Sequence, residues 1–109
     1  MKRLIAVLAA VSLVAALFAV PALARTRSVA VRDNVFSPRS LTIKRNDTIV
    51  FRWRGDNPHN VVARPGSPQR FRSSVKRSGT YRKKFTRRGT YRIVCTIHAP
   101  NMRMTVRVR

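Results

Sequence analysis

Residues 48–54 read TIVFRWR, a stretch in which large apolar side chains alternate with polar ones and arginines. Ile49, Phe51 and Trp53 share one parity, whereas both arginines occupy the other. Because successive side chains of a β-strand point to opposite faces, this period-two pattern predicts a strand with one buried and one solvated face. We therefore interpret Trp53, like the two tyrosines of the chain, as a core residue.

The same alternation recurs after residue 24, and no helical period competes with it. Further short runs of this kind are SVAVR at 28–32, LTIK at 41–44, NVVA at 60–63, TYRKKF at 80–85, TYRIVC at 90–95 and MTVRV at 104–108. Clusters of Pro, Gly, Asn, Asp and Ser separate the runs, as turns do between strands. Short strands at this spacing predict an all-β fold, an antiparallel sandwich or barrel.

The first 24 residues have a different character. Lys2 and Arg3 precede an apolar run from Leu4 to Val20, and residues 22–24 form the small-x-small sequence Ala-Leu-Ala. This pattern predicts a secretory signal peptide, residues 1–24, followed by one exported domain, residues 25–109. We expect that domain in the periplasm or outside the cell. An uncleaved N-terminal anchor is the alternative.

The chain is strongly basic and contains a single cysteine. Its net charge of +21 falls to +19 when Lys2 and Arg3 are removed with the signal peptide. An exported protein enters an oxidising compartment, where Cys95 has no internal partner for a disulfide. This cysteine must therefore be buried, reactive, paired with another chain or bound to a metal.

Cys95 begins the stretch CTIHAPNM, residues 95–102, which lies between two predicted strands. The other histidine, His59, stands far upstream at the start of another run. Taken singly, these residues have ordinary explanations: a buried small thiol, loop histidines and a core methionine. Together, one cysteine, two histidines and one methionine form the ligand set of a blue-copper site.

The sequence resembles the small cupredoxins plastocyanin, pseudoazurin and amicyanin. The matching stretches are DNVFSPRSLTIKRNDTIVFRW at 33–53, PHNV at 58–61 and GTYRIVCTIH at 89–98. The resemblance implies a Greek-key β-sandwich of about seven or eight strands. It also implies one type 1 copper ion, with ligands at His59, Cys95, His98 and Met102. Asn60 corresponds to the family residue that ties the two ligand loops together and tunes the thiolate.

Two features depart from the family pattern. HAPNM places three residues between His98 and Met102, where the family commonly has two or four. Met104 is the rival axial ligand, although its parity matches Val106 and Val108 and favours the core. The acidic surface patch of plant-type members is also absent, and the charge has the opposite sign.

Four protein ligands leave no open position for a substrate, so we expect no enzyme activity and instead single-electron transfer between Cu(I) and Cu(II). The resemblance implies that His98 is the electron port, with Pro58, Ala99 and Pro100 forming an apolar docking patch. The basic charge predicts steering toward an acidic redox protein that docks transiently. We expect a monomer.

Other functions remain open at this point. The charge also favours attachment to anionic envelope polymers or lipid headgroups, and a cationic envelope-binding domain is one alternative. A copper-binding or delivery protein without a redox partner is another. Specific nucleic-acid binding is not expected of an exported protein whose aromatic residues are buried. Two histidines are too few for a multicopper oxidase, and a methionine ligand is out of character for zinc.

Overall fold

The computed structural model describes residues 23–109, which form eight β-strands and no helix. The strands are β1 (Thr26–Arg32), β2 (Val35–Ser37), β3 (Ser40–Ile43), β4 (Thr48–Trp53), β5 (Val62–Ala63), β6 (Thr80–Lys84), β7 (Gly89–Val94) and β8 (Arg103–Val108). Apart from Leu23 and Ala24, the predicted signal segment lies outside the described residues. From residue 23 onward, no helix is long and apolar enough to cross a membrane.

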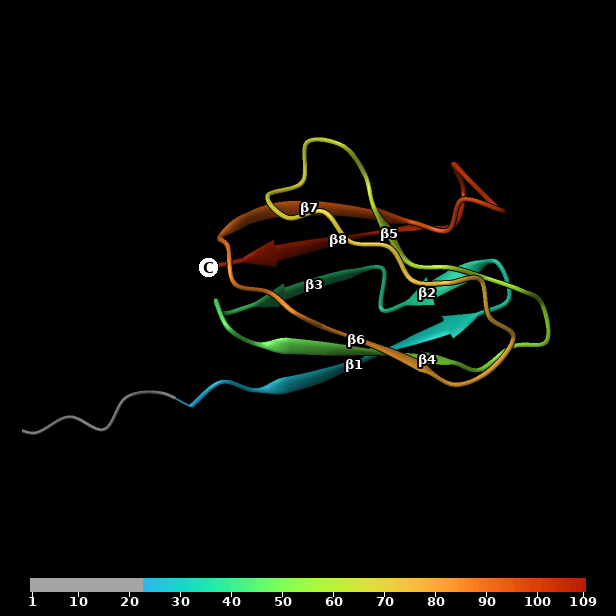
Figure 1. Cartoon of the computed structure of the whole chain (residues 1–109), viewed down its shortest axis with the longest axis horizontal. Helices are drawn as coiled ribbons and strands as arrows, with labels where there is room; N and C mark the ends of the chain where they lie inside the picture. The colour runs from blue at the N-terminus through green and yellow to red at the C-terminus, as the bar shows by residue number, and fades with distance from the viewer. Residues whose placement is uncertain (1–22) are drawn as a thin grey trace, which may run out of the picture.

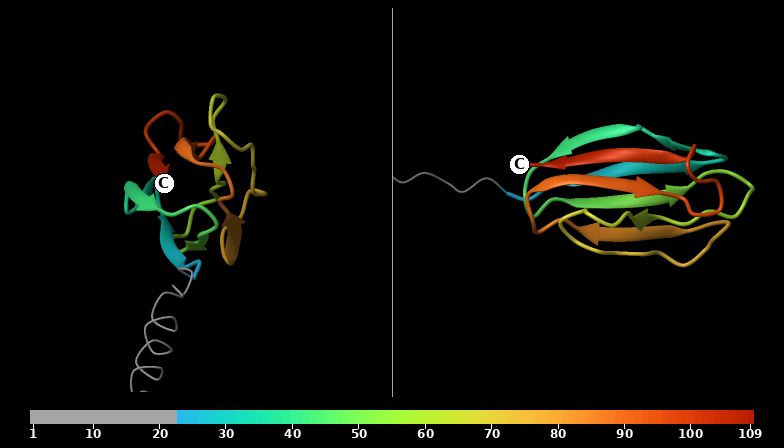
Figure 2. Two further views of the ribbon diagram at one scale, coloured as in Figure 1. Left: turned by 90° about the vertical axis from the view of Figure 1, so that its left-hand side faces the viewer. Right: turned by 90° about the horizontal axis from the view of Figure 1, so that it is seen from above.

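The strands form two four-stranded sheets that pack face to face (Figure 1). One sheet has the order β2-β1-β4-β6 and the other the order β3-β8-β7-β5. In the right-hand view of Figure 2, the red strand β8 runs beside β3, with the orange β7 on its other side. The prediction of an all-β Greek-key sandwich is thereby confirmed.

The turn spacing alone predicted antiparallel sheets, but two of the strand pairs are parallel. β1 pairs with β4 in parallel, and β3 pairs with β8 in parallel. Parallel neighbours cannot be joined by a tight hairpin, so they come from segments far apart in the chain. The chain passes from β2 in one sheet to β3 in the other within two residues and returns to the first sheet at β4, which separates β1 from β4. Strands β4 to β7 separate β3 from β8.

The core consists of the apolar residues that alternate along the predicted strands. Ile49, Phe51 and Trp53 of β4 are all buried, as are the alternate residues of β7 and β8. Phe85 packs edge-on against both Phe71 and Tyr91, with ring centroids 5.6 and 5.0 Å apart. Edge-to-face aromatic pairs of this kind add stability beyond the area that they bury. Trp53 and the tyrosines are thus structural residues, although Tyr81 is only half-buried.

Tyr91 forms a tyrosine corner at the start of β7. Its hydroxyl donates to the carbonyl oxygen of Arg87 at 2.7 Å and lies 2.9 Å from Oε1 of Gln69. We expect Tyr91→Phe to lower the free energy of unfolding by about 1 kcal/mol, because the Arg87 carbonyl loses its partner. In a domain of this size, that loss lowers Tm by about 4–8 °C. Thermal unfolding of this variant beside Tyr81→Phe measures the effect; equal changes in both variants would contradict it.

Asp47 fixes the turn before β4 from a buried position. Its carboxylate accepts hydrogen bonds from the backbone N–H groups of Arg25 and Lys44, at 2.8 and 2.9 Å. Burial by itself raises the pKa of this carboxyl group. The two N–H donors, together with the charges of Arg25 and Arg27, outweigh that effect and hold the pKa below its ordinary value of 3.8. Folding therefore favours the ionised form.

This shift predicts an acid-labile contribution to stability. Because the folded pKa lies below the unfolded one, the contribution is complete above about pH 5 and declines as the pH falls through 3.8 toward the folded pKa. We expect Asp47→Asn to be less stable than the native protein at pH 7 and to show a flatter decline below pH 5. Denaturant unfolding from pH 7 to pH 2 compares the two proteins. Parallel stability curves would show that Asp47 does not contribute.

Candidate metal centre

The loop that joins β7 to β8 is fixed by its own backbone. The N–H of Cys95 donates to the carbonyl of Met102 at 3.0 Å, and that of Met102 donates to the carbonyl of His98 at 3.2 Å. The N–H of His98 in turn donates to the carbonyl of Cys95 at 3.3 Å. These three bonds link the three predicted ligands of the loop to one another, so none can shift without the others.

The loop between β4 and β5, which carries His59, lies at the same end of the sandwich as the β7–β8 loop (Figure 1). His59 exchanges two backbone hydrogen bonds with Lys76, each of 2.9 Å. The indole Nε1 of Trp53 donates to the carbonyl of His59 at 3.1 Å. These contacts fix the backbone of His59 from two sides without involving its imidazole ring.

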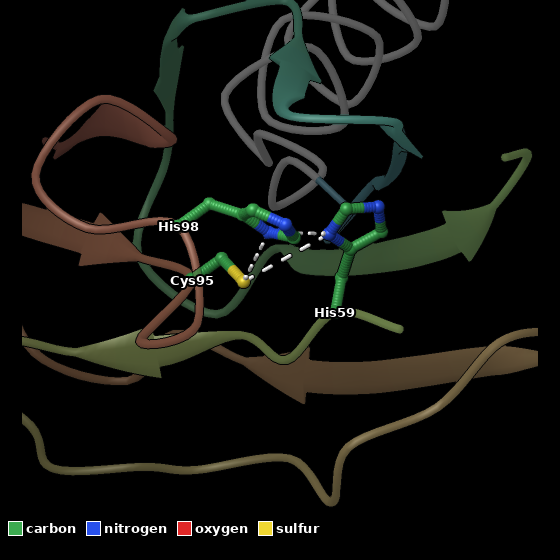
Figure 3. A group of neighbouring side chains, drawn as sticks. All are labelled: His59, Cys95 and His98. Carbon is green, nitrogen blue, oxygen red and sulfur yellow. Dashed lines mark hydrogen bonds between the residues drawn. The ribbon is translucent and has the colours of Figure 1, made fainter. Parts of the chain in front are cut away.

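Three side chains converge between these loops (Figure 3). Nδ1 of His59 lies 3.2 Å from Nδ1 of His98 and 3.9 Å from Sγ of Cys95, and Sγ lies 3.6 Å from Nδ1 of His98. A point equidistant from the three atoms lies about 2.1 Å from each of them, as these three distances require. Bonds from nitrogen and sulfur to a divalent metal are about 2.0–2.3 Å long. The spacing of these three atoms therefore fits one metal ion bound by all of them.

The donor set indicates which metal the triangle suits. A thiolate and two imidazoles in a trigonal arrangement are typical of blue-copper sites. His59 and Cys95 are fully buried, whereas His98 is half-buried and reaches the surface. Dry surroundings of this kind exclude water from the thiolate and control the redox properties of a bound metal.

Both methionines near the loop are buried. Met102 is fully buried within the ligand loop, next to the backbone bonds to Cys95 and His98. Met104 lies in β8 opposite Ile93 and joins the hydrophobic core, as its parity predicted. The position of Met102 in the loop favours it as the axial ligand over Met104.

Asn60 connects the two loops. Its Nδ2 donates to Oγ1 of Thr96 at 2.8 Å, and its Oδ1 accepts from the N–H of Thr96 at 2.8 Å. Thr96 directly follows Cys95, so Asn60 links the residues next to His59 and next to the thiolate. Asn60 is almost fully buried and Thr96 is exposed, so these two hydrogen bonds are partly shielded from water.

Asp33 is a residue of the site that the sequence did not reveal. Its Oδ1 lies 3.1 Å from Nε2 of His59, and its carboxylate accepts from the N–H groups of Asp56 and Asn57. These two backbone donors, followed by the His59 hydrogen bond, lower the pKa of Asp33 to about 2. Nδ1 of His59 faces the metal position, so its Nε2–H donates to Asp33 and fixes the ring orientation.

Asp33 looks like a turn residue in the sequence, since it follows β1 and stands far from His59. Gly55 is consistent with this role of Asp33. A Cβ at Gly55 would collide with the Asp33 carboxylate, so a glycine leaves room for this contact.

All three residues of the predicted docking patch reach the surface. Pro58 is half-buried, whereas Ala99 and Pro100 are exposed. Ile97, which the sequence did not single out, is 47% exposed and adds a large apolar side chain beside His98. Four apolar side chains therefore reach the surface in the two loops that carry the histidines.

Comparison with known proteins identifies the family. The model of the copper-binding proteins of the plastocyanin/azurin family matches residues 25–109. The chain belongs to this family. No curated protein matches the chain.

Solved structures agree with this membership. An amicyanin variant in its reduced state has a TM-score of 0.67 and 30% identity, covering 77% of this chain and 82% of that one. Another amicyanin variant, in its reduced Cu(I) form at pH 4, has a TM-score of 0.69 and 29% identity, covering 83% and 86%.

A third similar structure belongs to a much longer protein. The Cu-containing nitrite reductase (NirK) from Thermus scotoductus SA-01 has a TM-score of 0.67 and 26% identity over 84% of this chain. The match spans 23% of the nitrite reductase chain. This cupredoxin-like domain therefore corresponds to less than a quarter of that protein.

The family membership and the geometry agree on the cofactor. The cofactor of this cupredoxin is copper, and His59, Cys95, His98 and Met102 form the residue pattern of a type 1 site.

Proposed function

We propose that this cupredoxin is an exported one-electron carrier, not an enzyme. His59, Cys95, His98 and Met102 would hold the copper ion. The observation that carries the proposal is the ligand triangle of 3.2, 3.6 and 3.9 Å, which is buried except at His98. Bound copper supplies a couple that exchanges one electron between Cu(I) and Cu(II).

The protein's contribution is a frame that changes little between the two states. Backbone hydrogen bonds link Cys95, His98 and Met102, while Asp33 and Trp53 hold His59 from opposite ends. A geometry that suits both oxidation states keeps the reorganisation on electron transfer small. A rigid frame favours this use over copper delivery, which requires the metal to leave.

His98 is the proposed path for the electron. It is the ligand that reaches the surface, and Pro58, Ile97, Ala99 and Pro100 present an apolar patch around it. A small apolar patch suits a transient complex with a redox partner. The strongly basic surface then steers an acidic partner toward this end of a monomeric carrier, and salt screens that attraction.

Reversible redox cycling with metal retention tests the proposal. The copper-loaded protein is cycled by voltammetry while a Cu(I) chelator is kept apart from the protein by a dialysis membrane. We expect a reversible one-electron wave and no transfer of copper to the chelator. Release of copper at the first reduction would instead identify a delivery protein. Added salt should slow electron transfer to an acidic redox protein. A rate that does not fall with salt would contradict electrostatic steering.

A further inference from the structure

A basic hollow lies on the outer face of the sheet β3-β8-β7-β5, apart from the ligand triangle. Its cavity volume is about 730 Å³. Its polar lining includes Arg39, Arg64, Arg92, Arg103, Asn34 and Asn101. We call it the arginine basin. The sheet is the one that faces the reader in the right-hand view of Figure 2.

The sheet register brings these arginines together from four segments. Arg92 of β7 pairs with Thr105 of β8, and the N–H of Thr105 donates to the carbonyl of Arg39 at 2.9 Å. On the other side, the N–H of Arg64 donates to the carbonyl of Arg92 at 2.8 Å. Arg64 therefore lies opposite Arg92, and Arg39 directly precedes Ser40, the residue that pairs with Thr105. Arg103 stands two residues before Thr105 and belongs to the same face.

This arrangement is electrostatically costly without a counter-charge. Arg64 and Arg92 are directly opposed, and like charges at such positions destabilise a sheet. The chain has three acidic residues, none of which lines the basin. Asp33, although next to Asn34, is bound to His59 and two backbone N–H groups. From residue 23 to 109, no carboxylate lies within 4 Å of the four guanidinium groups.

The chemistry of the lining selects the ligand. A guanidinium group is always charged and presents paired N–H donors that match two oxygens of one anion. Asn34, Asn101 and Thr105 add neutral donors. A phosphate group has several acceptor oxygens and more than one negative charge, which suits donors that converge from several sides of a hollow. A phosphate group is small enough to enter the hollow, whereas a flat protein surface is not.

We propose that the arginine basin binds a phosphate group, supplied either by free phosphate or by a phosphate-bearing lipid headgroup. The site is independent of the copper-based function, since none of its four arginines is a ligand. It nevertheless adjoins the ligand loop, because Asn101 and Arg103 flank Met102. A bound phosphate places negative charge beside that loop and is expected to lower the reduction potential.

Titration of the protein with inorganic phosphate at constant ionic strength tests the site. We expect saturable changes in the amide NMR signals of Asn101, Arg103 and Arg92, both in the copper-free protein and in the diamagnetic Cu(I) form. Arg92→Gln is expected to weaken binding about tenfold, the loss of one charged hydrogen bond. Arg107→Gln is the matched control, since it removes the same charge from the neighbouring strand β8 of the same sheet, outside the basin. We expect it to change the affinity less than twofold, a charge effect without a lost contact.

Equal weakening by both variants, or amide shifts spread evenly over both sheets, would overturn the proposal. Stronger binding of citrate than of phosphate would overturn it as well, in favour of carboxylates. Vesicles of phosphatidylglycerol separate the two sources. Vesicle binding that Arg92→Gln weakens and free phosphate displaces would identify the headgroup as the ligand. Phosphate binding with unaltered vesicle binding in Arg92→Gln would identify free phosphate.

Discussion

Replacement of Cys95 by serine is expected to abolish the intense blue absorption of the copper-loaded protein. That absorption arises from charge transfer between thiolate and copper, and the chain contains no second thiol. Cys95 is fully buried, so no external thiol can replace it. Serine has nearly the same size, and a buried hydroxyl without a new partner costs only about 1–3 kcal/mol. The sandwich should therefore remain folded.

The visible spectrum of Cys95→Ser after addition of Cu(II) is the measurement, with circular dichroism as the check on folding. Met104→Leu is the control, because it removes a buried sulfur that we place in the core, and we expect it to stay blue. Met102→Leu is expected to keep the band but change the reduction potential. A blue band in Cys95→Ser would show that the thiolate is not a ligand.

Replacement of Asp33 by alanine is expected to weaken copper binding about 10- to 100-fold, the usual effect of losing a carboxylate behind a histidine ligand. The carboxylate holds the Nε2–H of His59 and two backbone N–H groups of the same loop, so both ring and loop lose their support. The reduction potential is expected to rise, since a nearby negative charge that favours Cu(II) is removed.

Competition with a copper chelator gives the affinity of this variant, and voltammetry gives its potential. Asp56→Ala is the matched control: it removes the same charge from the same end of the sandwich, and only its backbone N–H contacts Asp33. Asp33→Asn keeps an acceptor for His59 and separates the hydrogen bond from the charge. If Asp33→Ala and Asp56→Ala had equal effects, Asp33 would act only through its charge and not through its hydrogen bonds to His59 and the loop.

The local pattern of the sequence predicted which side chains face the core but not which strands pair. Ile49, Phe51 and Trp53 are buried as their parity requires. The parallel pairing of β1 with β4, however, depends on the crossing from β2 to β3, and no local period encodes it. Alternation constrains the faces of a strand and leaves its neighbours open.

The candidate site was predictable to the same extent. Cys95, His98 and Met102 share one short loop, so their spacing was informative. Asp33 was missed because the register that pairs Val31 with Trp53 brings the end of β1 beside the loop of His59. The arginine basin was missed for the same reason, since its four arginines come from four segments that are separated in the chain.

The visible absorption spectrum of the protein during titration with Cu(II) tests the central claim most directly. The account predicts an intense blue band that saturates at one equivalent of copper, disappears on reduction with ascorbate and returns on reoxidation. The absence of that band would contradict the assignment of His59, Cys95 and His98 as ligands of a type 1 site. Irreversible oxidation of Cys95 by the added copper would contradict it equally.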